Sequence, residues 1–320
     1  MMEKQSTPLV SVAVITYNSA SFVLETLDSV KKQSWLNLEL IISDDGSTDE
    51  TVQLCKQWLE KNGSHFDRTE IITVEKNTGI PANCNRAIKA SRGEWVKLIA
   101  GDDILDPCGV ENLMKEATPN KDVIIGSLRQ FRVSEGKKIY FDEVIPSKDI
   151  HFFFQKDAAF QYHYMLLSRP GFAAGAFIRR DLYDRIGYYD ERFWLMEDLP
   201  FWLKVNKCGI KLYLLKDVVA FYRIHDSVSI VNESKFINEN FHACTQLFHK
   251  EILDKEIPWY HFAYYETRMV DKLKFWMIIH VFKNKRTSWN KYIVKGLNAL
   301  RLEPWSNKFR IMMYRRSVTG

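Results

Sequence analysis

The chain has 320 residues, of which 46% are hydrophobic and 13% are aromatic. This composition can bury the core of one large domain with a smaller addition, and it excludes an intrinsically disordered protein. The formal charge of +5 conceals an asymmetry, because residues 271–320 carry 12 Lys or Arg and only 2 Asp or Glu. An acidic body is therefore followed by a strongly basic tail, which predicts an anionic partner for the tail.

The start of the chain and its cysteines indicate the cellular compartment in which the protein is expected. No basic region followed by a long apolar run is seen at the start, and the longest later apolar stretch, residues 275–282, is too short to span a bilayer. The five cysteines are scattered and lack CxxC spacing, which fits a reducing compartment and argues against structural zinc. We expect a cytoplasmic protein with neither signal peptide nor transmembrane helix.

Alternating strand and helix patterns fill the first 100 residues. We expect the first helix to be capped by Ser19 or Ser21, and the second to begin with a capping box of Ser47 and Glu50. Such βαβ repeats indicate an α/β fold with a Rossmann-like, mostly parallel sheet flanked by helices. Strands are expected at residues 10–16, 38–42, 71–74 and 95–100, with helices between them.

The pattern weakens after residue 103. The small-residue stretch 171–177 is expected to pack tightly, and Glu197 and Asp198 should begin a helix that runs to about residue 208. Beyond residue 229 only helical periodicity with many aromatics remains. This predicts an α/β domain at residues 1–230 and a basic, aromatic-rich helical region at residues 231–320. We further expect a helix near 110–117, a strand near 123–127, a hairpin around Gly136 and a helix at 180–186.

Ligands of such sheets bind beyond the carboxyl ends of the strands. Here those positions hold Tyr17 with Asn18, then Asp44 and Asp45 before Gly46 and Ser47, and later Asp102 and Asp103. A carboxylate at Asp45 could accept a hydrogen bond from a nucleobase N–H or a ribose hydroxyl. The alternative is that Asp45 only caps the turn or the helix.

The pair Asp102 and Asp103 gives the sharper signal. Two adjacent carboxylates at the end of a buried strand repel each other unless a cation neutralises them. Their hard oxygen ligands suit Mg²⁺ or Mn²⁺, with donor phosphates completing the coordination shell. The alternative is a solvated turn.

A proton acceptor is the next requirement of group transfer to a hydroxyl. Asp198 is the candidate general base, Glu197 is its rival, and a helix cap is the alternative for either residue. His225 follows an expected strand and is a candidate metal ligand, because imidazole is a common ligand of Mn²⁺. Arg223 could balance phosphate charge or form a surface ion pair.

Six segments together resemble the family 2 glycosyltransferases of the GT-A fold, with matching order and spacing from about residue 9 to residue 230. The resemblance implies an inverting transferase that moves a sugar from a nucleotide-sugar donor, usually a UDP-sugar, to an acceptor hydroxyl. The segments are VSVAVITYNSASFVLETLDSVKKQSW, LELIISDDGSTDET, NTGIPANCNRAI, GEWVKLIAGDD, GAFIRRDLYDRIGYYDERFWLMED and YRIHDSVS.

The resemblance also implies roles for individual residues. Asp102 and Asp103 look like the metal motif, with Asp103 the direct ligand and Asp102 near the ribose or the metal. Asp198 matches the acidic residue that serves as base. The nucleotide site would be lined by Thr16, Tyr17, Asn18 and Asp45.

Two departures from the family pattern refine these expectations. Ala100 stands where many members have a carboxylate, so the metal site rests on fewer protein carboxylates. The QxxRW-like motif of processive members is absent, which favours transfer of a single sugar, in polysaccharide or glycolipid biosynthesis.

Other classes of protein fit the sequence less well. Without a glycine-rich turn after the first strand, a dehydrogenase is disfavoured. No triphosphate loop of a nucleotidyltransferase is seen, but a catalytically silent sugar-nucleotide binder or scaffold stays open.

The basic tail lies outside the resemblance. Its lysines and aromatics could form an interfacial surface on the inner face of the cell membrane, where a lipid-linked acceptor would reside. The alternative is that the aromatics pack on the catalytic domain. No nucleic-acid motif accompanies the tail, so nucleic acid is not an expected partner. The residues concerned are Lys272, Lys274, Phe275, Trp276, Phe282, Lys283, Lys285, Arg286 and Trp289.

Overall fold

The computed structural model describes residues 7–224 and 235–319, with side chains as far as residue 313. The chain divides into two compact units. The first comprises residues up to Tyr162 together with Gly171–Ile224, and the second comprises His163–Pro170 with the residues after Ile224. The short segment 163–170 thus joins the C-terminal part. A boundary at residue 230 stays a prediction, because that position lies outside the described residues.

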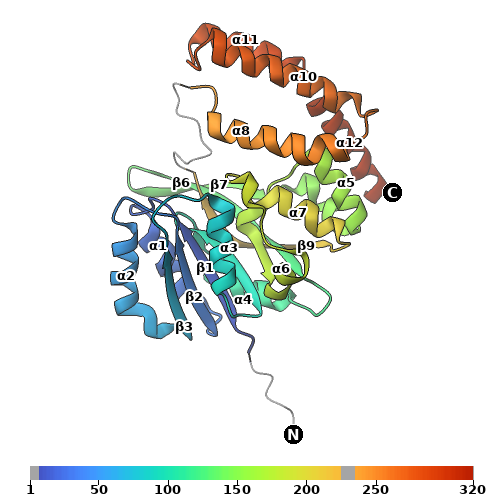
Figure 1. Ribbon diagram of the computed structural model, residues 1–320. Coiled ribbons are helices and arrows are strands. Elements are labelled where there is room, and N and C mark those ends of the chain that lie inside the picture. The colour runs from blue at the N-terminus through green and yellow to red at the C-terminus, as the bar shows by residue number, and fades with distance from the viewer. Residues whose placement is uncertain (1–6, 225–234, 320) are drawn as a thin grey trace. The chain divides into compact units, whose positions relative to one another are not determined.

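A nine-stranded sheet forms the centre of the first unit, with strand order β3-β2-β1-β4-β8-β6-β9-β5 and β7 paired to β6 (Figure 1). The first four strands in this order are parallel, β8 runs antiparallel to β4 and β6, and β6 and β9 are parallel. The predicted α/β sheet is confirmed. Its strands are β1 (Val10–Thr16), β2 (Leu38–Asp44), β3 (Arg68–Thr73), β4 (Trp95–Ala100), β5 (Ile104–Leu105), β6 (Val123–Ser134), β7 (Lys137–Ile145), β8 (Ala176–Arg179) and β9 (Leu212–Arg223).

The helices cover this sheet as the apolar periodicity predicts. Val10, Val12 and Val14 of β1 join one buried cluster with residues of the first, second and fourth helices. The strands β1, β2 and β3 follow one another toward one side of the sheet, whereas the connection from β3 to β4 crosses back to the other side of β1. Right-handed crossovers therefore place α3 on the opposite face of the sheet from α1 and α2. The helices of this unit are α1 (Val23–Lys31), α2 (Thr51–Asn62), α3 (Ile80–Ala90), α4 (Gly109–Glu116), α5 (Ala158–Ser168, which continues into the second unit), α6 (Arg180–Ile186) and α7 (Asp198–Lys207).

The predicted helix caps are wrong. Phe22 caps α1 and Glu50 caps α2, and neither cap makes a side-chain hydrogen bond. Ser47 instead donates its hydroxyl to the Asp44 carboxylate at 2.5 Å, and Ser19 exchanges a long 3.4 Å contact with the Tyr17 backbone. Both serines therefore contact the loops at the ends of the strands, and only Ser47 makes a short hydrogen bond there.

The backbone approaches itself closely in the middle of the sheet, where Gly175 lies against Gly126 of β6. A Cβ at Gly175 would lie 2.2 Å from the Gly126 carbonyl oxygen, so only glycine fits there and the small-residue stretch packs tightly as predicted. The hairpin around Gly136 is also confirmed, with β6 and β7 joined at Glu135 and Gly136.

Helices make up the second unit in its described residues. The unit contains α8 (Glu239–Phe248), a π-helical turn (His249–Leu253), α9 (Asp254–Glu256), α10 (Phe262–Trp276), a second π-helical turn (Met277–Val281), α11 (Ser288–Ala299) and α12 (Glu303–Thr319). Across the described ranges, no helix has the length and apolar character needed to cross a membrane.

Candidate active site

The ends of β1, β2 and β4 meet at one edge of the sheet. The Asp45 amide donates to the Thr16 carbonyl oxygen at 2.9 Å, and the Gly101 amide donates to the Ile15 carbonyl oxygen at 2.9 Å. A Cβ at Gly101 would lie 2.7 Å from Cγ2 of Thr16, so this loop needs glycine to approach. The structure thus brings the three predicted loops together.

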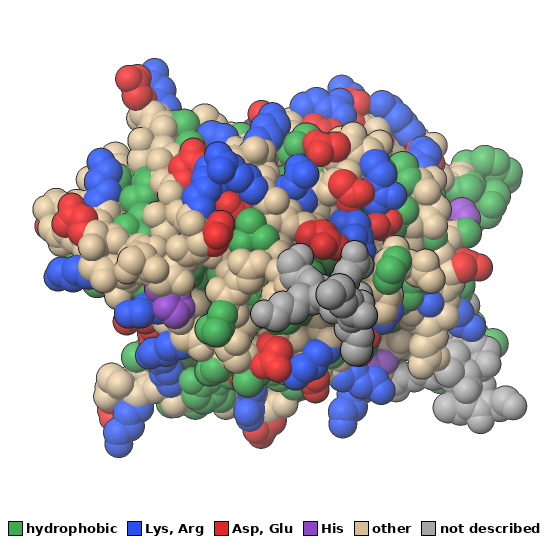
Figure 2. All heavy atoms as spheres, turned by 90° about the horizontal axis from the view of Figure 1, so that it is seen from below, with side chains coloured by type: hydrophobic (Ala, Val, Ile, Leu, Met, Phe, Trp, Pro, Cys, Tyr) green, Lys and Arg blue, Asp and Glu red, His purple; other side chains and the backbone are tan. Residues whose placement is uncertain are grey.

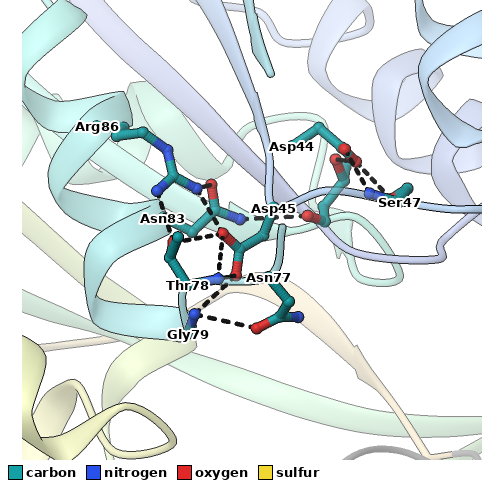
Figure 3. A network of polar contacts seen from close by, with 9 residues as sticks. Asp44, Asp45, Ser47, Asn77, Thr78, Gly79, Asn83 and Arg86 are labelled. Atoms are coloured by element: carbon teal, nitrogen blue, oxygen red, sulfur yellow. Dashed lines mark hydrogen bonds and ion pairs between the residues drawn. The ribbon is translucent and has the colours of Figure 1, made fainter. Parts of the chain in front are cut away.

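Asp44 holds the turn between β2 and α2. Its carboxylate accepts hydrogen bonds from the Thr16 hydroxyl at 2.8 Å and from the Ser47 amide at 2.8 Å (Figure 3). Gly46 has a φ of +78°, a left-handed conformation that favours glycine. Thr16, predicted to contact a nucleotide, is buried and directs its hydroxyl to Asp44 instead.

Asp45 lies in a denser network, and its side chain is only 3% exposed. The carboxylate accepts from the Thr78 hydroxyl at 2.6 Å, the Gly79 amide at 2.9 Å and the Arg86 guanidinium at 2.6 Å (Figure 3). Sequence reasoning missed Thr78 and Arg86 as partners. Arg86 lies on α3 (Ile80–Ala90), which packs against β2, and its position in the sequence does not indicate the pairing with Asp45.

Tyr17 and Asn18 lie on the exposed side of this edge. Tyr17 is 40% exposed, and Asn18 is also exposed, with a φ of +50°. Asn18 is one of the few residue types that tolerate a left-handed backbone. Its side-chain oxygen accepts from the Thr48 amide at 2.9 Å, and its amide donates to the Ser47 hydroxyl at 2.8 Å. These two residues are therefore held in place while remaining open to solvent.

Asp103 is buried at the end of β4, with 2% exposure. One of its carboxylate oxygens accepts from the Arg223 amide at 2.9 Å, and its carbonyl oxygen accepts from the Thr26 hydroxyl at 2.7 Å. Burial, and then the charge of neighbouring Asp102, raise the pKa of the Asp103 carboxyl well above its ordinary value. Asp102 is partly exposed. Such a pair gains most from a cation that neutralises both carboxylates.

Arg223 forms an ion pair, as one of its two predicted alternatives had it, but the arginine is buried rather than at the surface. Its side chain is 4% exposed, and its guanidinium lies between the rings of Phe22 and Phe131, 4.8 and 4.6 Å from their centroids. Its Nε donates to the Asp102 carbonyl oxygen at 2.7 Å, and its Nη2 pairs with Glu25 of α1. Arg223 is thus neither a surface ion-pair partner nor free to meet a phosphate, because it joins β9, α1 and the Asp102 loop.

Glu197 and Asp198 begin α7 as predicted, and both are partly buried. Asp198 accepts from the Leu199 amide at 2.7 Å and from the Phe172 amide at 3.4 Å. Burial raises the pKa of both carboxyl groups, and for Glu197 the charge of Asp198 raises it further. A raised pKa helps a carboxylate to accept a proton near neutral pH.

A backbone contact relates these carboxylates to the ends of the strands. Burial raises the pKa of the Tyr222 hydroxyl, and the charges of Asp103, Asp102 and Glu197 raise it further. The Ile80 amide donates to the Trp194 carbonyl oxygen at 2.8 Å, beside Gly79, where a Cβ would lie 2.6 Å from that oxygen. The Asp45 network therefore continues into the loop before α7.

The predicted metal ligands lie only partly within the described residues. Within residues 7–224 and 235–319 no group of three or more His, Cys, Asp or Glu side chains could hold a metal ion. His225, the second predicted ligand, lies outside the described residues. Two carboxylates still fit Mg²⁺ or Mn²⁺, since these ions commonly take their other ligands from substrate phosphates and water.

Comparison with known proteins identifies the family. The family model described as "Glycosyl transferase family 2" matches residues 11–187, more than half of the chain. The chain belongs to glycosyltransferase family 2. It is 28% identical over 134 residues to Glycosyltransferase GlyG of Streptococcus pneumoniae. The aligned part covers 42% of this chain and 43% of GlyG, so the chain spans less than half of that relative's length.

Solved structures agree on the fold. S. aureus TarS 1-349 in complex with UDP-GlcNAc aligns with a TM-score of 0.55 at 18% identity, covering 96% of this chain and 91% of TarS 1-349. The mannosyltransferase PcManGT from Pyrobaculum calidifontis, in complex with GDP-Man and Mn2+, aligns with a TM-score of 0.51 at 16% identity, covering 98% of this chain and 75% of that one. The predicted GT-A fold with a C-terminal helical extension is confirmed.

Proposed function

We propose that the chain transfers a single sugar from a nucleotide-sugar donor, most simply a UDP-sugar, to an acceptor hydroxyl, with inversion at the anomeric carbon, in polysaccharide or glycolipid synthesis. The observation that carries the proposal is that backbone hydrogen bonds attach the loops of two acidic pairs to the same end of the sheet. The Gly101 amide, just before Asp102 and Asp103, donates to Ile15 of β1, and the Trp194 carbonyl oxygen, four residues before Asp198, accepts from the Ile80 amide beside the Asp45 network. One pair suits a cation beside phosphates, and the other suits proton removal. The UDP-GlcNAc complex of TarS supports the choice of donor.

The donor site is proposed at the shared end of β1, β2 and β4. Tyr17 and Asn18 are the exposed residues there, and they would contact the nucleotide directly. Thr16 and Asp45 would shape the site from beneath, because internal donors already bind their polar groups. Asp45 would reach a nucleobase only by exchanging one of these hydrogen bonds. Asp102 would face the ribose or the metal.

A divalent cation, Mn²⁺ or Mg²⁺, is proposed at Asp103 and Asp102, with His225 as a further ligand. Burial makes an ionised Asp103 costly without a cation, which is the physical reason for placing one there. When bound, the ion would stabilise negative charge on the departing nucleoside diphosphate. The Mn2+ complex of PcManGT supports the choice of ion.

Asp198 is proposed as the general base. It would take the proton of the acceptor hydroxyl as that oxygen forms a bond to the anomeric carbon, while the bond from this carbon to the phosphate oxygen breaks and the nucleoside diphosphate leaves. Two backbone amides orient the Asp198 carboxylate, and burial raises its pKa and so its basicity. Glu197 remains the rival for this role.

Thermal unfolding tests the donor and metal sites together. We expect a UDP compound to stabilise the wild type only when Mn²⁺ or Mg²⁺ is present, by about 2.7 kcal/mol at a hundred times its dissociation constant. Asp103→Ala should abolish this gain. The matched control is Asp106→Ala, another loop aspartate in the same segment, which should keep it.

The outcomes separate the proposal from its alternatives. The best-stabilising sugar nucleotide identifies the donor. Stabilisation by nucleotides without any metal, equal in wild type and Asp103→Ala, would refute the metal site. If no nucleotide stabilises the wild type at any metal concentration, the nucleotide site is not functional and a scaffold role replaces the enzyme.

A further inference from the structure

Helix α11 (Ser288–Ala299) of the second unit has no buried residue. Its apolar side chains nevertheless recur at the spacing of one helix face. Trp289 is 73% exposed, Tyr292 is 72% exposed, and Leu300, just past the end of the helix, is 62% exposed. Positions separated by three, eight and eleven residues share one side of a helix. An amphipathic face is thus formed but left uncovered.

A helix of this kind needs a partner. Helices of about 12 residues are marginal in water even with favourable sequences, and most helical stability comes from burying an apolar face. Helix α11 contacts α10, and its Ile293, Val294 and Leu297 side chains are partly buried. The Thr287 hydroxyl accepts from the Asn290 amide at 3.3 Å, and Asn298 accepts from Lys274 at 3.0 Å. These contacts hold the helix without covering Trp289 and Tyr292.

The charge of this region indicates the kind of partner. Residues 272–302 contain eight Lys or Arg and no Asp or Glu. Lys291 and Lys295 lie on α11, exposed, and an exposed basic turn of Lys283, Lys285 and Arg286 precedes the helix. Positive charge beside Trp and Tyr is the combination that favours the headgroup level of an anionic bilayer.

The neighbouring helices repeat the same pattern. Each has an exposed apolar stripe that includes one tryptophan, and both helices are joined to each other through the Glu303 amide, which donates to the Thr267 hydroxyl at 3.0 Å. The charge of these helices differs from that of the face shown in Figure 2, where acidic and basic side chains are interspersed. The stripes are Phe262, Met269, Leu273 and Trp276 on α10 (Phe262–Trp276), and Trp305, Phe309 and Met312 on α12 (Glu303–Thr319).

We propose that α11, with the basic turn before it, docks on the surface of an anionic lipid bilayer, its Trp289 and Tyr292 at headgroup level and Lys291 and Lys295 against lipid phosphates. Charge selects this occupant over a second copy of the chain, because two copies would bring like charges together. The proposal stands whether or not the transferase activity is established, since its test needs no substrate.

Vesicle sedimentation of the full chain tests the proposal. We expect the wild type to bind vesicles of equal parts phosphatidylcholine and phosphatidylglycerol, to bind phosphatidylcholine alone much less, and to be released by salt. The double variant Lys291→Gln, Lys295→Gln should bind the mixed vesicles about thirtyfold more weakly, because each lysine near the surface contributes about fivefold. The double variant Trp289→Ala, Tyr292→Ala should lose about tenfold.

Matched variants on the first unit provide the controls. Lys56→Gln, Lys61→Gln removes the same charge from exposed positions of α2, and Leu36→Ala removes an apolar side chain that is 74% exposed. Both should bind vesicles like the wild type. Circular dichroism of every variant checks that the helices remain folded.

Four results would overturn the proposal. The wild type could fail to bind either vesicle, or the α11 variants could bind as the wild type does. Light scattering could show a dimer that Trp289→Ala, Tyr292→Ala converts to a monomer, which would make this face an interface between copies. A nucleic-acid duplex could displace the protein from vesicles and bind it with the same variant dependence, which would assign the surface to nucleic acid.

Discussion

Two kinds of buried carboxylate lie in the same α/β unit. Asp45 and Glu39 each face a guanidinium, from Arg86 at 2.6 Å and from Arg68 at 2.9 Å, and each also accepts hydrogen bonds from backbone amides. Asp103 also accepts a backbone amide hydrogen bond, from Arg223, but burial and then the charge of Asp102 raise its pKa, against the opposite effect of Lys97 and Arg223. Asp45 therefore has an arginine in direct contact, whereas for Asp103 burial and a neighbouring carboxylate outweigh the nearby cations.

This difference distinguishes carboxylates that stabilise the fold from carboxylates that are suited to binding a ligand or a proton. A carboxylate with a resident cation stabilises the fold and has little reason to bind another one. A buried carboxylate whose pKa is raised by burial and by a neighbouring carboxylate is costly to ionise, and it becomes less costly when a ligand supplies positive charge or a proton. Glu197 and Asp198 belong to this second kind, since burial raises the pKa of both and the charge of Asp198 raises that of Glu197 further.

Removal of the proposed base should give the largest effect. We expect Asp198→Asn to lower the rate of transfer about a thousandfold, because an amide cannot accept the hydroxyl proton. Stability should not fall, since the substitution relieves a buried charge next to Glu197. Release of nucleoside diphosphate measures the rate. Glu197→Gln is the matched control, and if it alone abolishes transfer, the base is Glu197.

Asp45→Asn should act on the fold instead. The substitution leaves the Arg86 guanidinium without its charged partner, and we expect a loss of about 3 kcal/mol in the free energy of unfolding. Asp103→Asn should lose nothing or gain stability in metal-free buffer. Urea titration of both variants measures the two free energies. Equal destabilisation by both would erase the distinction between the two kinds of carboxylate.

Arg223 offers a test of the support around Asp102 and Asp103. In Arg223→Met the contacts to the Asp102 carbonyl oxygen and to Glu25 are lost, so the loop should be less well held, and affinity for Mn²⁺ should fall about tenfold. Calorimetric titration with Mn²⁺ and UDP measures it. Arg129→Met, at a more exposed arginine on β6, is the control. A variant that unfolds more easily but binds Mn²⁺ normally would assign Arg223 to stability alone.

The smallest expected effect is on the free energy of unfolding at acid pH. Burial alone would raise the pKa of Glu39, but hydrogen bonds from Ser11, the Arg92 amide and Arg68 outweigh it and hold the pKa below its ordinary 4.5. Because the folded-state pKa is lowered, the stabilisation is complete above pH 4.5 and is lost as the pH falls below it. Wild type should lose about 1 kcal/mol more than Glu39→Gln between pH 6 and pH 3 in urea titrations. Parallel curves would contradict this.

Local patterns in the sequence were sufficient for much of the fold. The bounds of β1 were predicted to the residue because all of its positions except the partly buried Ile15 are buried, which makes the apolar run continuous. The serine caps were wrong because Ser47 is needed by Asp44, a contact set by the turn at Gly46 rather than by helix propensity.

Site residues that depend on distant partners were harder to predict. The acidic pairs could be found from the sequence, because two adjacent carboxylates are recognised without knowledge of the fold. Arg86 opposite Asp45, and Arg223 between two phenylalanine rings, are separated from their partners by dozens of residues, and a single sequence contains no sign of such pairings.

The absence of a side chain at Gly79 allows the loop before α7 to rest directly on the start of α3 (Ile80–Ala90). One end of this contact leads through the Gly79 amide to Asp45, and the other leads through Trp194 to Asp198, four residues on. In the proposed reaction, this backbone contact would connect the nucleotide side of the site to the proposed base, Asp198, so that a shift on one side could be transmitted to the other.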